Sequence, residues 1–287
     1  MIKSYKGFDK DMKCRDFQYE VGKEYEMDGE IKCCDRGFHA CKSPMEVWDY
    51  YDMLKSRYAE VEQSGKIDTE ENSTKVCSSR IKIKAELKLA DIINIGVEWL
   101  KDITSPSKVK TDSTLSSSGD NAKIGSSGDN AQIGSSGYNA KIGSSGDNAQ
   151  IGSSGDNAKI GSSGYNAQIG SSGYNAQIGS SGDNAKIGSS GYNAKIGSSG
   201  DNAQIGSSGY NAKIGSTGED SVVMCAGKKS IAKATVGSWI TLAEWKWNDK
   251  KKRNVPVCVK TEYVDGERIK ADTWYQLKDG EFVEVDE

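Results

Sequence analysis

The hydrophobic positions in the middle of the chain recur every nine residues. The repeated unit is G-S-S-G-[DY]-N-A-[KQ]-I, and eleven copies carry its alanine at position 122 and at every ninth position up to 212. Alanine and isoleucine lie two residues apart, which predicts a very short strand with both side chains inward and the intervening Lys or Gln outward. We expect the GSSG segment to supply positive φ angles and tight turns.

A strand of this length cannot bury its own apolar face, so neighbouring units must stack and form a common core. The pattern therefore predicts a parallel β-solenoid. A disordered Gly/Ser linker is the alternative, but a linker does not need an aliphatic residue at a fixed spacing.

The outward residues indicate that two nonapeptides make one coil. Taking every second unit gives one set that is mostly lysine and one that is mostly glutamine: Lys123, Lys141, Lys159, Gln177, Lys195 and Lys213 against Gln132, Gln150, Gln168, Lys186 and Gln204. The tyrosines that replace Asp divide in the same way, with Tyr138, Tyr174, Tyr192 and Tyr210 in the first set and Tyr165 in the second. An 18-residue coil with two unlike faces explains this division, although recent duplication of an 18-residue unit would also produce it.

Imperfect copies extend the solenoid to residues 110–235, which is fourteen units and therefore seven coils. At the usual spacing between strands the rod would be about 34 Å long. In the last two units the inward pairs are Ser221 with Val223 and Ser230 with Ala232, while Val222 and Ile231 take the outward position. Because these outward residues are apolar, we expect the C-terminal segment to cover them as a cap.

The variable positions form the predicted repeat surface, which has two interpretations. They keep a repetitive rod from pairing edge to edge, or they display side chains to a partner. For the charges we favour solubility, and for the tyrosines stacking and partner contact weigh equally. The positions are Lys123, Tyr138, Lys141, Lys159, Tyr165, Tyr174, Tyr192, Lys195, Tyr210 and Lys213.

Residues 1–104 show the mixed periodicity of an α+β domain, and 105–109 form the predicted linker. Strands are predicted at 4–8, 36–41, 57–67 and 78–87. A helix is predicted over 43–54, with Ser43 as N-cap and Pro44 at its first position. A second helix is predicted over 89–103.

Residues 236–287 are predicted to form an antiparallel β cap of four or five strands. Segments 238–247 and 255–264 alternate as strands, and Asp265-Gly266 and Asp279-Gly280 are hairpin turn signals. We expect the tryptophans to build the small core and to cap the solenoid: Trp239, Trp245, Trp247 and Trp274.

The N-terminal residues resemble the ADP-ribosyltransferase fold in their order of elements. The likeness rests on Lys6-Gly7 in a first strand, on residues 37–41 (GFHAC), on a Ser-capped helix and on the strand 59–62. The resemblance implies that Lys6 and Gly7 hold NAD, with Lys6 where the poly-ADP-ribose polymerase branch has the His of its His-Gly pair. It places His39 where that branch has a Tyr of the nicotinamide side, and offers Glu60 or Glu62 as the catalytic carboxylate.

The whole architecture also resembles uncharacterised repeat proteins of gut bacteria and their phages. The shared segments are the start KGFDKD…GFHAC and the later SWITLAEW. This resemblance implies no particular activity.

Composition narrows the function classes. A net charge of −3 does not suggest a nucleic-acid partner, and a mean hydropathy of −0.65 without a long apolar run argues against a membrane span. Seven cysteines, with Cys33 next to Cys34, and an N-terminus without a signal-like apolar run indicate reduced thiols and a cytoplasmic protein in a host bacterial cell. The spacing of Cys14, Cys33, Cys34 and Cys41 around His39, the only histidine, fits no metal motif.

Three functional hypotheses remain at this stage. The first is a non-enzymatic scaffold of phage or prophage type without a cofactor, whose solenoid is a rigid spacer or display surface for a host or phage protein. The second is an NAD-dependent ADP-ribosyltransferase-like enzyme whose rod selects a host macromolecule. The third is a self-assembling protein that forms homo-oligomers.

Overall fold

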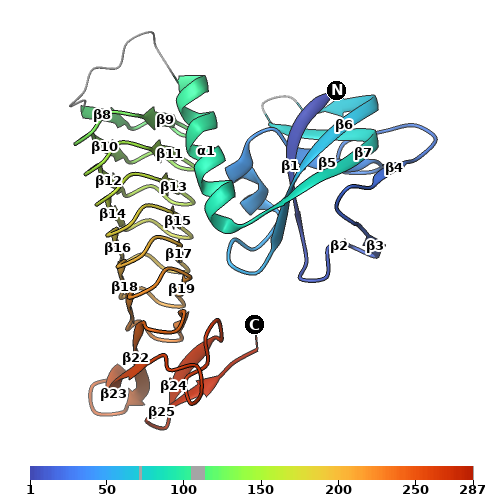
Figure 1. Cartoon of the computed structure of the whole chain (residues 1–287). Helices are drawn as coiled ribbons and strands as arrows, with labels where there is room; N and C mark the ends of the chain where they lie inside the picture. The colour runs from blue at the N-terminus through green and yellow to red at the C-terminus, as the bar shows by residue number, and fades with distance from the viewer. Residues whose placement is uncertain (71–72, 105–113, 287) are drawn as a thin grey trace. The chain divides into compact units, whose positions relative to one another are not determined.

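The computed structural model describes residues 1–70, 73–104 and 114–286, so the predicted linker at 105–109 lies outside the described residues. It consists of two compact units, Met1–Trp99 and Leu100–Glu287, each described here by itself (Figure 1). No helix among the described residues combines the length and the apolar character that crossing a bilayer would need.

The N-terminal unit is built on a five-stranded antiparallel sheet in the order β4-β7-β5-β1-β6, in which β6 also pairs with β7. The long strands β6 and β7 therefore fold the sheet back on itself around a core that includes Phe8, Ala59 and Ile81. The predicted strands of this part are confirmed. The strands are β1 (Ile2–Phe8), β2 (Lys13–Cys14), β3 (Phe17–Gln18), β4 (Glu24–Glu26), β5 (Phe38–Cys41), β6 (Arg57–Thr69) and β7 (Lys75–Leu87).

The two predicted helices have different outcomes. The helix α1 (Leu89–Thr104) matches the prediction. The helix predicted over 43–54 is only the 3₁₀ helix η1 (Pro44–Asp49), and Ser43 makes no side-chain cap hydrogen bond. Pro44 to Trp48 are all buried, so this segment lacks the polar stripe that a longer amphipathic α-helix would turn to solvent.

The repeats form a parallel β-solenoid of two sheets, as predicted. The glutamine sheet contains β8 (Thr114–Ser117), β10 (Gln132–Ser135), β12 (Gln150–Ser153), β14 (Gln168–Ser171), β16 (Lys186–Ser189), β18 (Gln204–Ser207), β20 (Val222–Cys225), β22 (Trp239–Asn248) and β23 (Arg253–Tyr263). The lysine sheet contains β9 (Lys123–Ser126), β11 (Lys141–Ser144), β13 (Lys159–Ser162), β15 (Gln177–Ser180), β17 (Lys195–Ser198), β19 (Lys213–Ser216), β21 (Ile231–Lys233), β24 (Tyr275–Lys278) and β25 (Glu281–Glu284).

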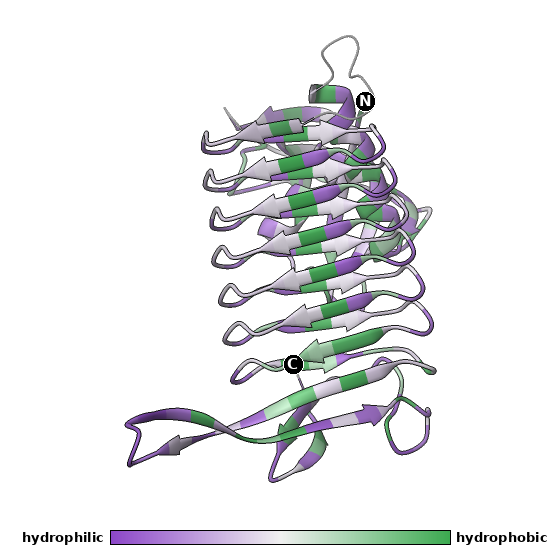
Figure 2. Cartoon of the chain, turned by 90° about the vertical axis from the view of Figure 1, so that its left-hand side faces the viewer, coloured by the Kyte–Doolittle hydropathy of each residue, from purple (hydrophilic) through white to green (hydrophobic). Residues whose placement is uncertain are grey.

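Strand register confirms that two nonapeptides make one coil. Gln132 pairs with Gln150 in one sheet, and Lys141 pairs with Lys159 in the other, an offset of 18 residues. The same order of hydropathy recurs in each coil, as Figure 2 shows. Alanines from Ala131 onward and isoleucines from Ile133 onward fill the interior, as expected from their spacing. The second inward residue of each strand is serine, such as Ser162, which is also buried.

Asparagine, and not glycine, takes the left-handed backbone in each repeat turn. From Asn121 to Asn211 the φ angles lie between 54° and 57°, a region that Asn tolerates better than most residues. Several of these side chains also form a ladder, in which the amide of Asn175 donates to Oδ1 of Asn157 at 3.1 Å. The expectation that the GSSG glycines supply the positive φ is therefore wrong.

The turn glycine is required by close stacking instead. A Cβ at Gly155 would lie 2.0 Å from the carbonyl oxygen of Gly137 in the preceding coil, and the turn glycines from Gly137 to Gly227 meet the same obstacle. Only a residue without a side chain fits there.

The variable turn position also has a structural role. Where it is Asp, the carboxylate accepts a hydrogen bond from the backbone N–H one coil further on, as Asp156 does from Tyr174 at 2.8 Å. Where tyrosines follow one another they stack, with 5.4 Å between the ring centroids of Tyr174 and Tyr192. The variation between Asp and Tyr therefore exchanges one contact between coils for another.

The C-terminal residues form two hairpins that extend different sheets. Strand β22 continues the glutamine sheet and pairs with β23, while the β24–β25 hairpin continues the lysine sheet and turns at Asp279-Gly280 as predicted. Asp265-Gly266 does not make a two-residue hairpin. It begins a loop in which the Asp265 carboxylate accepts backbone hydrogen bonds from three residues: Glu267, Arg268 and Ile269.

The cap core is aliphatic rather than built from tryptophan. Ile240, Leu242 and Val264 are fully buried in it, whereas Trp239 and Trp247 are 47% and 56% exposed. Trp239 takes an outward position on β22, because its side chain alternates with the buried Ile240 and Leu242. The predicted tryptophan core is therefore wrong for Trp239 and Trp247, whereas Trp245 and Trp274 are half-buried and Nε1 of Trp245 donates to the carbonyl oxygen of Ala226 at 2.9 Å.

Candidate functional site

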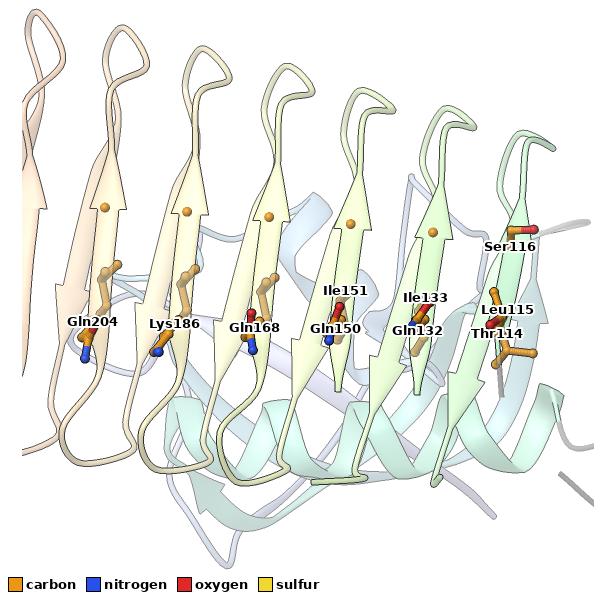
Figure 3. A pocket seen from close by; sticks show the side chains of 18 of the residues that line it. Thr114, Leu115, Ser116, Gln132, Ile133, Gln150, Ile151, Gln168, Lys186 and Gln204 are labelled. Carbon is orange, nitrogen blue, oxygen red and sulfur yellow. The ribbon is translucent and has the colours of Figure 1, made fainter. Parts of the chain in front are cut away.

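The outer face of the glutamine sheet carries two parallel rows of residues, which together we call the glutamine face. Each strand gives one residue to each row, because residues two apart share a face. The glutamine row is Gln132, Gln150, Gln168, Lys186 and Gln204, and the glycine row is Gly134, Gly152, Gly170, Gly188 and Gly206. Figure 3 shows the labelled glutamine-row side chains side by side, one on each strand.

The glycine row leaves a groove of about 1120 Å³ along this face. A Cβ added at any of its five glycines would meet nothing within 4 Å. These glycines also have no left-handed backbone. Neither conformation nor packing within the described residues therefore explains why this position is always glycine from Gly134 to Gly206.

The groove is nearly uncharged. Asp, Glu, Lys and Arg make up 28% of the whole chain, but Lys186 is the only one of them among the residues that line the groove. Low charge is typical of the core of a protein interface and unusual for a solvated surface.

An apolar patch continues the glutamine face toward the C-terminus. Val222, Trp239 and Tyr263 follow one another in register across β20, β22 and β23, and each is more than 40% exposed. Met224 lies beside them and is 50% exposed. The prediction that the cap covers the outward apolar residues is wrong for Val222, which is 45% exposed, whereas Ile231 is 7% exposed.

The predicted repeat surface is only partly exposed. Tyr138, Tyr165, Tyr174 and Tyr192 are exposed and Tyr210 is half-buried. Among the lysines, Lys123 is exposed, Lys159 is buried, and three are half-buried: Lys141, Lys195 and Lys213.

The N-terminal unit contains a separate cavity of about 840 Å³, within the usual range of small-molecule sites. It is lined by three residues that the sequence singled out, Lys6, Gly7 and His39, together with aromatic side chains such as Tyr19 and Tyr51. Arg15 and Cys34, which also line it, have left-handed backbones without being glycine. Such conformations are often found at functional sites.

Lys6 is only 3% exposed. Its ammonium donates to the carbonyl oxygen of His39 at 3.1 Å and to the hydroxyl of Tyr51 at 3.4 Å, and it lies over the rings of Phe8, Tyr19 and Tyr51. Burial lowers the pKa of this amine below its usual value, because the charged form loses its hydration.

Both nitrogens of the His39 ring bind the protein backbone. The N–H of Cys34 donates to Nε2 at 3.0 Å, which places the ring proton on Nδ1, and the ring has a backbone hydrogen bond with Gly37. Burial, followed by the charges of Lys6 and Lys75, lowers the pKa of His39. The ring is therefore held by the loop that precedes β5, and burial favours its neutral form.

Glu60 and Glu62 do not line the cavity. Lys6 pairs with Ala59 across β1 and β6, and neighbouring residues on a strand point to opposite faces. The two glutamates therefore lie on the other face of the sheet, where Glu60 pairs with Lys3 and Glu62 with Lys84. The carboxylates that do line the cavity belong to Asp16 and Asp35.

The seven cysteines are free thiols. Burial raises the pKa of the Cys41 thiol to about 12, so this side chain stays protonated near neutral pH. Within the described ranges, no three side chains of His, Cys, Asp or Glu come close enough together to hold a metal ion.

The sequence interpretation did not identify the glycine row as a surface feature. It assigned that glycine to the turn, whereas the strand runs from Gln132 through Gly134 to Ser135. The available signal was the spacing: a glycine two residues after each Lys or Gln must share its outward face once a strand is assumed.

A family described as a domain of unknown function (DUF7666) matches residues 2–95. The match covers most of the N-terminal unit and none of the repeats. Neither the curated proteins nor the solved structures contain a match to the chain.

Proposed function

We propose that the chain is a non-enzymatic interaction protein, of the phage or prophage type that its sequence resembles, acting in the cytoplasm of a host bacterium. In this proposal the solenoid is a rigid spacer, and the glutamine face is where a protein partner docks. The single observation that carries the proposal is the groove of about 1120 Å³ along a face with one charged residue.

Two further features support a docking role for this face. The groove exists because five positions are glycine although an added Cβ would meet nothing within 4 Å. The apolar side chains of Val222, Met224 and Trp239 extend the same face and are about half exposed, and exposed apolar patches next to a groove typically mark binding surfaces.

The test compares capture of host proteins by three immobilised chains: the wild type, a Gly152→Lys/Gly170→Lys double variant, and Tyr165→Lys. The double variant fills the groove with charge where an added Cβ meets nothing within 4 Å. Tyr165→Lys is the control for an added surface lysine, because it adds one lysine at an exposed turn away from the groove. A partner held by the wild type and the control but lost by the double variant supports the proposal. Equal capture of every host protein by all three means that none of them docks on the glutamine face.

An ADP-ribosyltransferase-like enzyme, with the rod choosing its target, is the second candidate. The observation in its favour is that Lys6, Gly7 and His39 line one cavity. Against it, both ring nitrogens of His39 bind backbone and Glu60 lies on the opposite face of the sheet.

Incubation with labelled NAD and a bacterial lysate tests this second candidate. Transfer of label or release of nicotinamide by the wild type, and not by a folded His39→Ala variant, would establish the enzyme. An absence of turnover, together with no thermal stabilisation by NAD, would remove it.

A further inference from the structure

The relief of the glutamine face alternates between large and small residues in a regular way. On each repeat strand a large side chain in the glutamine row is followed, two residues later, by a glycine, as in Gln150 and Gly152. The order large then small holds at both ends of the face, with Thr114 and Ser116 on β8, and with Trp239 and Thr241 on β22. Only β20 differs, because its two outward residues, Val222 and Met224, are both large and apolar.

This relief is complementary to itself about one particular symmetry axis. A two-fold axis that runs along the rod, midway between the rows, places the glutamine row of each copy over the glycine row of the other. Gln150 of one copy then lies over Gly152 of the second, and the reverse contact repeats the same fit. A two-fold axis across the rod would instead oppose glutamine to glutamine and leave the glycine rows facing an empty gap.

We propose that the glutamine face binds a second copy of this chain, with the two solenoids parallel and in register and each glutamine row seated in the partner copy's glycine row. This inference rests on the proposed function, which makes the same face the interaction surface. It adds the identity of the partner, a second copy of the chain.

The chemistry of the face suits such a contact. Lys186 is the single charge in the groove, so the other four residues of the glutamine row bring no charge into the contact. The two copies' Lys186 lie at the same level on adjacent rows, and this pair of like charges weakens the dimer. Stacked glutamine side chains can hydrogen-bond along their own ladder when two sheets close over them. The exposed Val222, Met224 and Trp239 lose contact with water in the same step.

The size of the face predicts a weak, reversible dimer. Eight parallel strands from β8 to β22, about 4.8 Å apart, make a face about 34 Å long, and four residues per strand make it about 13 Å wide. The flat area is then about 440 Å² per copy, and roughly 900 Å² in total, near the lower limit of specific interfaces. We therefore expect a dissociation constant in the micromolar range.

Sedimentation equilibrium tests the association directly. The wild type and Tyr165→Lys are expected to dimerise with the same dissociation constant, and Gly152→Lys/Gly170→Lys to weaken it by at least about tenfold, because it places two charges in each groove. A wild type that stays monomeric at millimolar concentration, or a double variant that dimerises as well as the wild type, overturns the inference.

Cross-linking with a short bis-maleimide tests the register. A mixture of Gln132→Cys and Gly134→Cys chains is expected to give a link between positions 132 and 134 of different chains, identified by peptide mapping against the native thiols. A Gln132→Cys/Gln204→Cys chain is expected to give no link between positions 132 and 204, because four coils separate them along parallel rods. A strong link between 132 and 204 of different chains would mean antiparallel rods and would overturn the proposed arrangement.

The two proposals fail differently. If the wild type is monomeric but the groove variant still loses a captured protein, the glutamine face binds another partner and only the inference about a second copy is wrong. If the groove variant changes neither capture nor sedimentation, the proposed function fails as well.

Discussion

Two glycines of one nonapeptide, Gly152 in the strand and Gly155 in the turn, should respond in opposite ways to replacement by alanine. Neither has a left-handed backbone, so the comparison isolates the space around the new methyl group. At Gly152 the methyl meets nothing within 4 Å. Gly152→Ala should raise the free energy of unfolding by about 0.4–1 kcal/mol, since alanine has less conformational freedom to lose on folding.

At Gly155 the methyl would lie 2.0 Å from the carbonyl oxygen of Gly137, so the stacked turns must separate. The hydrogen bonds at risk are Ser154 N–H to the Ser135 carbonyl, at 3.0 Å, and Asn139 N–H to the Asp156 carbonyl, at 2.9 Å. Two weakened bonds at about 1 kcal/mol each, together with about 1 kcal/mol of steric strain, give an expected loss of about 2–4 kcal/mol.

Urea unfolding followed by far-ultraviolet circular dichroism measures both variants. A repeat array can unfold in more than one step, so the comparison uses transition midpoints and unfolding slopes rather than a single extrapolated value. A Gly155→Ala chain as stable as the wild type would refute the account of the turn. A Gly152→Ala chain destabilised by more than about 1 kcal/mol would show that the glycine row has a packing role, and would remove the main reason for treating the groove as functional.

Four further outcomes follow from the same structure. Asn175→Ala should lower the free energy of unfolding by about 1–2 kcal/mol, because alanine disfavours the backbone at φ 54° and the amide ladder is lost. Asn175→Gly accepts that backbone, so it should recover about half of the lost stability, measured by urea midpoints. Ser162→Ala should leave stability unchanged or raise it by up to about 1 kcal/mol, since the buried Ser162 hydroxyl has no hydrogen-bond partner among the described residues; a clear loss of thermal stability would contradict this. His39→Ala should lower stability by about 0.5–1.5 kcal/mol in urea, because it removes the acceptor of the exposed Cys34 N–H hydrogen bond. Unchanged stability would refute this role of the ring. Lys6→Met should stabilise the N-terminal unit at pH 7 and lose part of that advantage toward pH 10. The folded pKa of Lys6 lies below its unfolded value of 10.5, so keeping the buried amine protonated at pH 7 opposes folding of the wild type, and this cost falls as the pH rises. A stability difference between variant and wild type that is constant from pH 7 to pH 10 would contradict the lowered pKa.

The solenoid was predictable because its determinants are local and repeated. Ala and Ile at fixed spacing define an inward face, and the division between lysine and glutamine sets the coil at two units before any coordinate is known. The turn could not be assigned in the same way. What requires Gly155 is the carbonyl of Gly137, 18 residues earlier, and such a distance depends on stacking that the local sequence does not describe.

The flanking parts depended on contacts that a linear pattern cannot contain. The segment Pro44–Asp49 is only a 3₁₀ helix, with Pro44 to Trp48 all buried, whereas helical periodicity alone favours a longer α-helix. In the N-terminal cavity, Lys6 and His39 were identified as a pair and do line one site. The backbone bonds that occupy the His39 ring come from Cys34 and Gly37, and no motif signals them.

Some positions of the nonapeptide are required for folding and one is not. Ala131 and Ile133 fill the interior, Asn130 supplies the left-handed turn, and Gly137 lets the coils approach. Alanine at Gly134 would satisfy the strand equally well and would reduce the entropy of the unfolded chain. A position that stays glycine in every strand of the glutamine sheet from β10 to β18, at a small expense of stability, is best explained by the space that it keeps open. That space forms a continuous groove only because it recurs in register, so the function we propose belongs to the assembled face and not to any single repeat.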